Sequence, residues 1–179
     1  MRTDTSRTLF LDRDGVINNE IKGGYVLNWD MFRFADGVLE ALPVLAARFG
    51  RIVMVTNQRC IGRGLLTEDG LKQIHEQMLE VIRAHGGRID KIYYCPDVDS
   101  DSPCRKPNGG MALQAKADFP DIDFTNAVMV GNTLSDMNFG KNLDMTTVFI
   151  PSTQAHHHFP HPLMDYRCNS LLDFSLIIQ

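Results

Sequence analysis

The stretch TLFLDRDGV, residues 8–16, ends an apolar run with two carboxylates and a glycine. The run does not alternate polar and apolar side chains, which is typical of a strand buried on both faces of a parallel sheet. In such sheets ligands bind beyond the carboxyl ends of the strands. Asp12 and Asp14 are therefore expected at a site where one carboxylate attacks and the other transfers protons. Taken alone, the motif could also be a polar turn that ends at Gly15.

Four more apolar runs, rich in Val, Ile, Phe or Tyr, occupy residues 51–56, 91–95, 127–131 and 146–150. Helical patterns lie between them, and the clearest begins after Thr67. Strands that alternate with helices predict a doubly wound, Rossmann-like α/β fold with a parallel sheet flanked by helices. We expect residues 1–179 to form a single domain of this kind.

The remaining helices have weaker signals. Asp36 is expected to cap a helix whose first turns Pro43 distorts or shortens. Shorter helices are expected over residues 111–117 and 134–143. A final amphipathic helix is expected in SLLDFSLII, residues 170–178.

Composition narrows the classes of function. The chain has 179 residues, of which 44% are hydrophobic, and a formal net charge of -4. This charge argues against nucleic acid as a partner, because nucleic-acid-binding surfaces are usually strongly basic. No segment approaches the roughly 20 apolar residues that span a bilayer, and no signal peptide is apparent. We expect a soluble cytoplasmic protein, a monomer or small homo-oligomer, that binds a small molecule.

Polar residues follow three further predicted strands. They are Thr56 to Gln58, Arg105 with Lys106, and Asn132 to Asp136. Hydroxyls and amides can bind phosphoryl oxygens, adjacent cations suit an anion, and an amide with a carboxylate can complete a metal site. Each motif alone also fits an ordinary loop, a solvated basic turn, or helix capping by Asn132 or Ser135. Their occurrence in order after four successive strands favours a common site.

The segments LFLDRDGVIN, VTNQ, CRKP and VGNTLSDM resemble the four ordered motifs of the haloacid dehalogenase superfamily of phosphohydrolases. Within it, FLDRDGVIN, IYYCP and CRKP..GM are similar to the branch that contains histidinol-phosphate and heptose-bisphosphate phosphatases. The similarity covers roughly residues 8–150. It implies a Rossmann-like fold, and the short intervals between motifs leave no room for a large cap domain.

The resemblance implies a role for each motif residue. Asp12 would be the nucleophile that forms an aspartyl-phosphate, and Asp14 would be the general acid and base. Thr56 and Lys106 would hold the transferring phosphoryl group. The expected substrate-binding residues are Asn57, Gln58, Arg63 and Arg105.

The resemblance also implies a magnesium ion. Its expected ligands are Asp12, the backbone carbonyl of Asp14, Asn132 and Asp136. The chain departs from the family here, because Asn132 stands where the fourth motif usually has an aspartate. An amide oxygen can ligate magnesium but brings no charge. We therefore expect an active enzyme that needs more magnesium than its relatives.

Three functions are compatible with these motifs. The first is a magnesium-dependent phosphatase that removes the C7 phosphate of D-glycero-D-manno-heptose 1,7-bisphosphate. The second is a histidinol-phosphate phosphatase, which shares the same motifs, so the substrate is a sugar phosphate or an amino-alcohol phosphate. The third is a weakened phosphosugar-binding or regulatory protein, suggested by Asn132 and by the cysteine loop described next.

The loop YCPDVDSDSPCRKP, residues 94–107, resembles a four-ligand zinc loop of the family. Only Cys95 and Cys104 remain of its ligands, because Asp97 replaces a histidine and Ser102 replaces a cysteine. Four scattered cysteines argue against a secreted disulfide framework, which leaves reduced thiols or a metal clip. A hydroxyl is a poor zinc ligand, so we expect no structural zinc.

Two other groups have two interpretations each. The histidines at 156–158, with His161, suggest a metal tract, but the prolines around them favour a polar surface loop. Trp29, Phe32 and Phe34 could face a sugar ring, but such residues more often pack beneath a loop.

Overall fold

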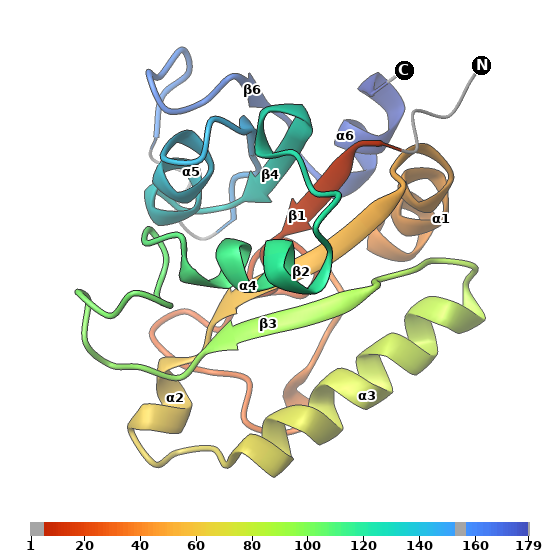
Figure 1. Ribbon diagram of the computed structural model, residues 1–179. Coiled ribbons are helices and arrows are strands. Elements are labelled where there is room, and N and C mark those ends of the chain that lie inside the picture. Colours follow the sequence, from red (N-terminus) through yellow and green to blue (C-terminus); the bar gives the residue numbers. More distant parts are fainter. Residues whose placement is uncertain (1–5, 153–156, 179) are drawn as a thin grey trace.

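The computed structural model describes residues 6–152 and 157–178. Its centre is a six-stranded sheet in the order β3-β2-β1-β4-β5-β6, with every neighbouring pair parallel. The strands are β1 (Thr8–Leu11), β2 (Arg51–Asn57), β3 (Lys91–Cys95), β4 (Ala127–Gly131), β5 (Thr146–Phe149) and β6 (Tyr166–Arg167). The predicted α/β fold with a parallel sheet is confirmed (Figure 1). In the described part of the chain, no helix has both the length and the apolar character needed to cross a bilayer.

Helices cover both faces of the sheet. Strand residues alternate in direction, so Leu9 and Leu11 point to one apolar cluster and Phe10 to the other. The first cluster includes α1 (Val38–Arg48), α3 (Glu68–Ala84) and α6 (Leu171–Ile177). The second includes α4 (Gly110–Asp118) and α5 (Leu134–Lys141). Burial on both faces explains why the strands read as continuous apolar runs.

The strand order places a switch point at the centre of the sheet. The chain runs from β1 outward through β2 to β3, and then returns to β4 on the other side of β1. Crossovers therefore leave in opposite directions from β1 and from β4, which opens a crevice at their carboxyl ends. The segments that follow these two strands carry Asp12, Asp14, Asn132 and Asp136.

The connections near this crevice are short. The segment between β1 and α1 holds only the 3-10 helix η1 (Trp29–Met31), and the segment between β2 and α3 holds only α2 (Arg59–Gly62). A second 3-10 helix, η2 (Phe124–Asn126), precedes β4. Among the described residues there is accordingly no large cap domain, as predicted. Phe32 is buried and stacks on Trp29 with ring centroids 5.0 Å apart, which fits the packing interpretation of these aromatic residues.

Three local predictions differ from the structure. Gly37, with φ of +76°, precedes α1 in place of the expected cap Asp36. The helix continues through Pro43 to Arg48, so the expected disruption is wrong. Burial of Leu42 and Leu45 stabilises the helix despite the missing N–H group. Strand β6 was not predicted, because two residues are too short to show a pattern.

Candidate active site

The loop after β1 is held against the loop after β4. The backbone N–H of Asp12 donates to the carbonyl of Val130 at 3.0 Å. Gly15 has φ of +89°, and a β-carbon there would lie 2.1 Å from the side-chain amide of Asn132. Only glycine fits both the left-handed conformation and this close approach. The glycine of the D-x-D-G motif thus brings the two loops into one site.

Lys106 connects three elements at the bottom of the site. Its Nζ donates to Asp12 Oδ1 at 2.7 Å and to the Val55 carbonyl at 2.8 Å, and it lies 2.6 Å from Asp136 Oδ1. These partners use all three ammonium hydrogens. Burial opposes the charge, but the Asp12 and Asp136 carboxylates outweigh it and raise the pKa of Lys106. The lysine is therefore a permanent cation beside the predicted nucleophile.

Asp12 lies in a site that is short of positive charge. Burial raises the pKa of Asp12 to about 7, and the Asp136 carboxylate adds to this effect while Lys106 opposes it. One ammonium group does not balance two neighbouring buried carboxylates. Additional positive charge at this point would favour the ionised, nucleophilic form of Asp12.

The carboxylate of Asp14 is surrounded by donors. Arg13 contacts both of its oxygens, at 2.9 and 3.0 Å, Asn18 donates at 3.0 Å and Gln58 donates at 2.9 Å. Burial would raise the pKa of Asp14, but Arg13 and these hydrogen bonds hold it below its usual range. Asp14 is therefore ionised in this state. A negatively charged ligand beside it would raise that pKa, as a general acid requires.

The residues after β2 support the site from within. Gln58 is buried and donates to Thr56 Oγ1 at 2.8 Å. Because that oxygen accepts, the Thr56 hydroxyl hydrogen is available to a ligand. Asn57 exchanges two hydrogen bonds with the backbone of Lys106, at 3.0 and 3.2 Å. Both amides thus bind the protein itself, and the expectation that they contact substrate stays a prediction.

The start of α5 fixes Asp136. The helix is capped by Thr133 in a capping box, so the alternatives of Asn132 or Ser135 as cap are wrong. Oδ2 of Asp136 accepts from the backbone of Asn132 at 3.2 Å and from the Thr133 backbone and hydroxyl at 3.0 and 2.7 Å. Its Oδ1 is left to face Lys106. Sequence reasoning had not linked this cap to the site.

Three oxygens converge where the predicted magnesium would bind. In the structure, Oδ1 of Asn132 faces Asp12 Oδ2 and the carbonyl oxygen of Asp14, while its Nδ2 donates to Ser152. No hydrogen bond explains three acceptors facing one another, whereas a hard cation between oxygen ligands does. With the amide turned over, its nitrogen would instead donate to Asp12 at 3.2 Å and to Asp14 at 3.1 Å. The oxygens of Asp12, Asp14 and Asn132 therefore fit a magnesium ion. In the turned-over orientation, the amide nitrogen of Asn132 takes the place of that ion.

These groups line a pocket of about 490 Å³. Its lining residues are Asp12, Asp14, Glu20, Thr56, Asn57, Arg105, Lys106, Asn132, Thr133, Leu134, Ser135, Asp136 and His157. We call Asp12, Asp14, Thr56, Lys106 and Asp136 the floor of the site. Of the predicted site residues, Gln58 and Arg63 do not line the pocket.

Arginines gather beside the pocket. Burial and the charges of Arg59 and Arg63 lower the pKa of Arg105, which places three guanidinium groups near one another. Arg63 also donates to the Tyr25 hydroxyl at 2.7 Å. We call Arg59, Arg63, Arg105 and Tyr25 the rim. A group of cations at the edge of this pocket suits a second anion.

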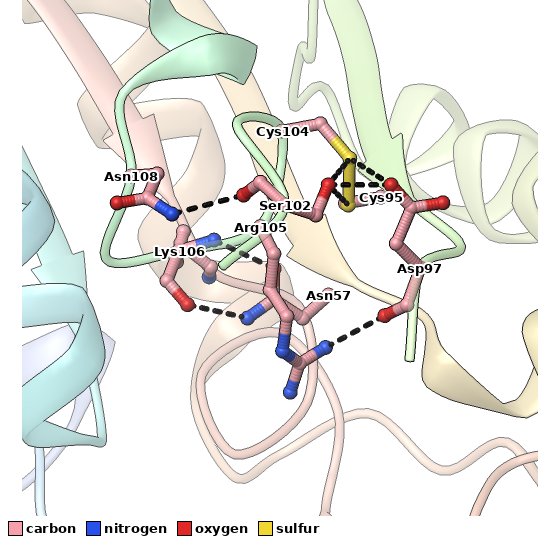
Figure 2. The surroundings of a disulfide bond; sticks show 8 residues. All are labelled: Asn57, Cys95, Asp97, Ser102, Cys104, Arg105, Lys106 and Asn108. Carbon is pink, nitrogen blue, oxygen red and sulfur yellow. Dashed lines mark hydrogen bonds between the residues drawn. A yellow bond between two sulfur atoms is a disulfide. The ribbon is translucent and has the colours of Figure 1, made fainter. Parts of the chain in front are cut away.

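The loop before Arg105 contains a disulfide between Cys95 and Cys104, whose Cα atoms are 5.5 Å apart (Figure 2). The disulfide corrects the expectation of reduced thiols or a metal clip, because the sequence does not show that the loop returns to the end of β3. The carboxylate of Asp97 lies close to both sulfur atoms. Ser102 donates to this carboxylate. Arg105 donates to the backbone carbonyl of Asp97 at 3.3 Å, so the loop contacts the rim (Figure 2).

Comparison with known proteins defines the family. A Campylobacter jejuni protein named D-glycero-alpha-D-manno-heptose-1,7-bisphosphate 7-phosphatase is 40% identical over 145 residues, which cover 81% of this chain and 82% of the relative. The chain belongs to the haloacid dehalogenase superfamily of phosphatases. The HAD-hydrolase-like family model matches residues 103–173. A Mycobacterium tuberculosis (H37Rv) protein of the same name is 34% identical, covering 95% of this chain and 90% of its own.

Solved structures agree. The D,D-heptose 1.7-bisphosphate phosphatase from B. bronchiseptica, complexed with magnesium and phosphate, has a TM-score of 0.85 and 26% identity. It covers 95% of this chain and 96% of its own. The enzyme from Burkholderia thailandensis has a TM-score of 0.68 and 27% identity, with coverage of 95% and 96%. The predicted membership of the haloacid dehalogenase superfamily is confirmed.

Three residues at this phosphatase site were missed. Arg13 and Asn18 bind Asp14, and His157 lines the pocket. Arg13 and Asn18 lie within the first motif, so their proximity to Asp14 was a usable signal. His157 contacts Phe149 and His161 through its ring, and it joins no metal cluster among the described residues. The neighbouring His156, part of the same histidine run, lies outside those residues.

Proposed function

We propose that this phosphatase removes the C7 phosphate of D-glycero-D-manno-heptose 1,7-bisphosphate. The observation that carries the proposal is the separation of positive charge into two places. Lys106 is buried in the floor, and Arg105 of the rim lines the same pocket, with the charges of Arg59 and Arg63 acting on it. A bisphosphate matches this arrangement, with one phosphate at each place. The names of the relatives support the same substrate.

Histidinol phosphate fits less well. It has one phosphate and an amine that is cationic at neutral pH, and that amine would approach the cationic rim. A pure binding protein is also disfavoured, because Asp12, Asp14, Thr56 and Lys106 are assembled in one site. Binding alone would not require a nucleophile paired with a buried lysine.

The proposed reaction has two steps. A carboxylate oxygen of Asp12 attacks phosphorus, the bond from phosphorus to the C7 oxygen breaks, and Asp14 gives that oxygen a proton. Water then attacks the phosphorus of the aspartyl-phosphate while Asp14 takes a proton from it. The products are the sugar with a free C7 hydroxyl and inorganic phosphate, and Asp12 is regenerated.

Other floor residues stabilise the transferring group. Lys106 neutralises charge on Asp12 and on the phosphoryl oxygens, and the Thr56 hydroxyl donates to one of them. Magnesium would be held by Asp12, the Asp14 carbonyl and Asn132, with Asp136 as a direct ligand only if it leaves Lys106 and otherwise acting through water, and it would supply positive charge that offsets repulsion between nucleophile and phosphate.

The substrate is tested by phosphate release from heptose 1,7-bisphosphate, histidinol phosphate and an aryl phosphate, with and without magnesium. Both anomers are included, because the relatives include enzymes named for each. The bisphosphate should have the highest kcat/KM by about tenfold or more. Faster turnover of histidinol phosphate would refute the assignment. A binding protein would form no beryllofluoride adduct on Asp12.

We propose further that Asn132 weakens magnesium binding. Its amide brings no charge, and the orientation with its oxygen inward competes with the turned-over one, in which its nitrogen would donate to Asp12 and Asp14. Calorimetric titration should show tighter magnesium binding in Asn132→Asp by about tenfold. Equal affinities would contradict this explanation. The measurement needs no substrate, so it is independent of turnover.

We also propose that the cysteine loop carries no structural zinc in the cytoplasm. The disulfide sulfurs cannot bind zinc as thiolates, and with the bond reduced the two sulfurs and one carboxylate would still have only a serine hydroxyl at the fourth position. Metal analysis of protein purified without chelator should find far less than one zinc per chain. One zinc per chain would overturn the proposal.

A further inference from the structure

Arg13 occupies an unusual place for an arginine. Its side chain is only 1% exposed and is among the largest fully buried side chains. One nitrogen, Nη2, contacts both oxygens of Asp14 and lies 3.3 Å from Gln58 Oε1. The Nε has no partner among the described residues. A buried cation is costly unless it is paired, so its contacts need a physical reason.

The other terminal nitrogen of Arg13 reaches a different element. Nη1 lies 3.1 Å from Nε2 of His75, which is 62 residues away in sequence and lies on α3. Arginine has only donors, so Nε2 must accept and the ring hydrogen must be on Nδ1. Burial and the charge of Arg13 lower the pKa of His75 to about 3, which keeps the ring neutral. His75 is therefore a fixed acceptor for the guanidinium group.

Helix α3 is a firm support for this acceptor. It has 17 residues, Thr67 caps its start, and Leu71, Ile74 and Met78 on either side of His75 are buried in the core. A continuous path thus runs from the helix through His75 and Arg13 to Asp14. Asn18 and Gln58 bind Asp14 as well, but they come from the loops after β1 and β2.

We propose that His75 is a positioning residue, which fixes Arg13 so that Arg13 holds the Asp14 carboxyl group where it exchanges a proton with the leaving oxygen. His75 touches no reacting atom itself. The inference rests on the proposed function, because it assumes that Asp14 is the general acid. Loss of the His75 acceptor would leave Arg13 free to shift, and small displacements of a catalytic group have large effects on rate.

Leaving-group dependence isolates this role. The value of kcat/KM covers the steps up to cleavage of the phosphorus–oxygen bond. An alkyl phosphate needs a proton on its departing oxygen, whereas a nitrophenyl phosphate releases a stable phenolate without one. Faulty placement of Asp14 should therefore lower kcat/KM for the sugar phosphate and spare the aryl phosphate. A general loss of folding would lower both.

Two substitutions at His75 make the comparison specific. His75→Leu removes the acceptor, and we expect kcat/KM for the sugar phosphate to fall about tenfold while that for the aryl phosphate changes less than about twofold. His75→Gln offers a side-chain oxygen at a similar reach, and should recover most of the loss. His85→Leu is the matched control, because His85 is an exposed histidine just beyond α3 and should give wild-type values.

Asp14→Asn sets the scale, and it should show the same selectivity with a larger loss. Formation of the beryllofluoride adduct at Asp12, followed by fluorine NMR, should be unchanged in both His75 variants. If Asp14→Asn is selective but His75→Leu affects neither substrate, or both equally, His75 has no positioning role. Failure of His75→Gln to recover activity would count against it in the same way. If Asp14→Asn shows no selectivity, the acid role of Asp14 falls and this inference falls with it.

Discussion

The floor and the rim of the site are built differently. Floor residues are buried or partly buried where the segments that follow β1, β2, β3 and β4 converge, and Lys106 contacts Asp12, Val55 and Asp136. Rim residues lie on loops and on the short helix α2, and Arg63 is exposed, with Tyr25 as its hydrogen-bonding partner. Side chains fixed by several buried contacts are held more precisely than side chains on exposed segments. The comparison suggests that the floor performs a reaction common to the superfamily while the rim selects the ester.

The strongest test of the floor is Asp12→Asn. The amide cannot form an aspartyl-phosphate, so kcat should fall by at least about four orders of magnitude for every substrate. Stability should be unchanged or higher, because a buried carboxylate beside Asp136 is removed. Steady-state rates and thermal melting check both statements. Substantial residual turnover of one substrate would show that another group attacks.

Lys106→Met tests the contribution of Lys106 to the stability of the floor and to the rate of turnover. The substitution leaves Asp12 and Asp136 buried without their shared cation, so the free energy of unfolding should drop by about 3 kcal/mol. Turnover should fall about 10²- to 10³-fold for all substrates, since lost charge stabilisation affects each transition state. Urea unfolding and kcat measurements provide the check. A stable protein with normal turnover would contradict the central place of Lys106.

Arg105→Ala tests the rim. Removal of one guanidinium group should lower kcat/KM for the bisphosphate about tenfold and leave an aryl phosphate within about twofold. Stability should not change, because Arg105 is partly exposed and has one weak backbone contact. Arg88→Ala is a suitable control, since Arg88 pairs with Asp90 just before the start of β3, at the opposite end of that strand from the site. Equal loss for both substrates would place Arg105 in the floor.

The same division explains what the sequence could predict. Five of the six strands, their parallel direction and the clustering of Asp12, Lys106 and Asp136 followed from apolar runs that are followed by polar residues. These features depend on the strand ends alone. Gln58 is buried and donates to Asp14, and no pattern of residue types fixes such a direction; its contact with substrate stays a prediction.

Contacts between segments that are distant in sequence could not be predicted from the sequence. The bond from Arg13 to His75 depends on how α3 crosses the sheet, and the disulfide depends on the path of an irregular loop. The cap of α5 is a milder case, because Thr133 lies between the two candidates that were considered. Asn132, Thr133 and Ser135 are all residue types that favour helix caps, so residue type alone did not separate them.

The smallest expected effect comes from reduction of the disulfide. Its loop reaches the rim through the contact of Arg105 with the Asp97 carbonyl, whereas the backbone of Lys106 is held separately by Asn57. Reduction should therefore leave kcat for an aryl phosphate unchanged and raise KM for the bisphosphate by about twofold. Assays with and without dithiothreitol, with the number of free thiols measured in parallel, check this. If reduction instead lowered kcat for both substrates, the loop would position Lys106 as well as Arg105. The floor and the rim would then depend on the same disulfide-linked loop.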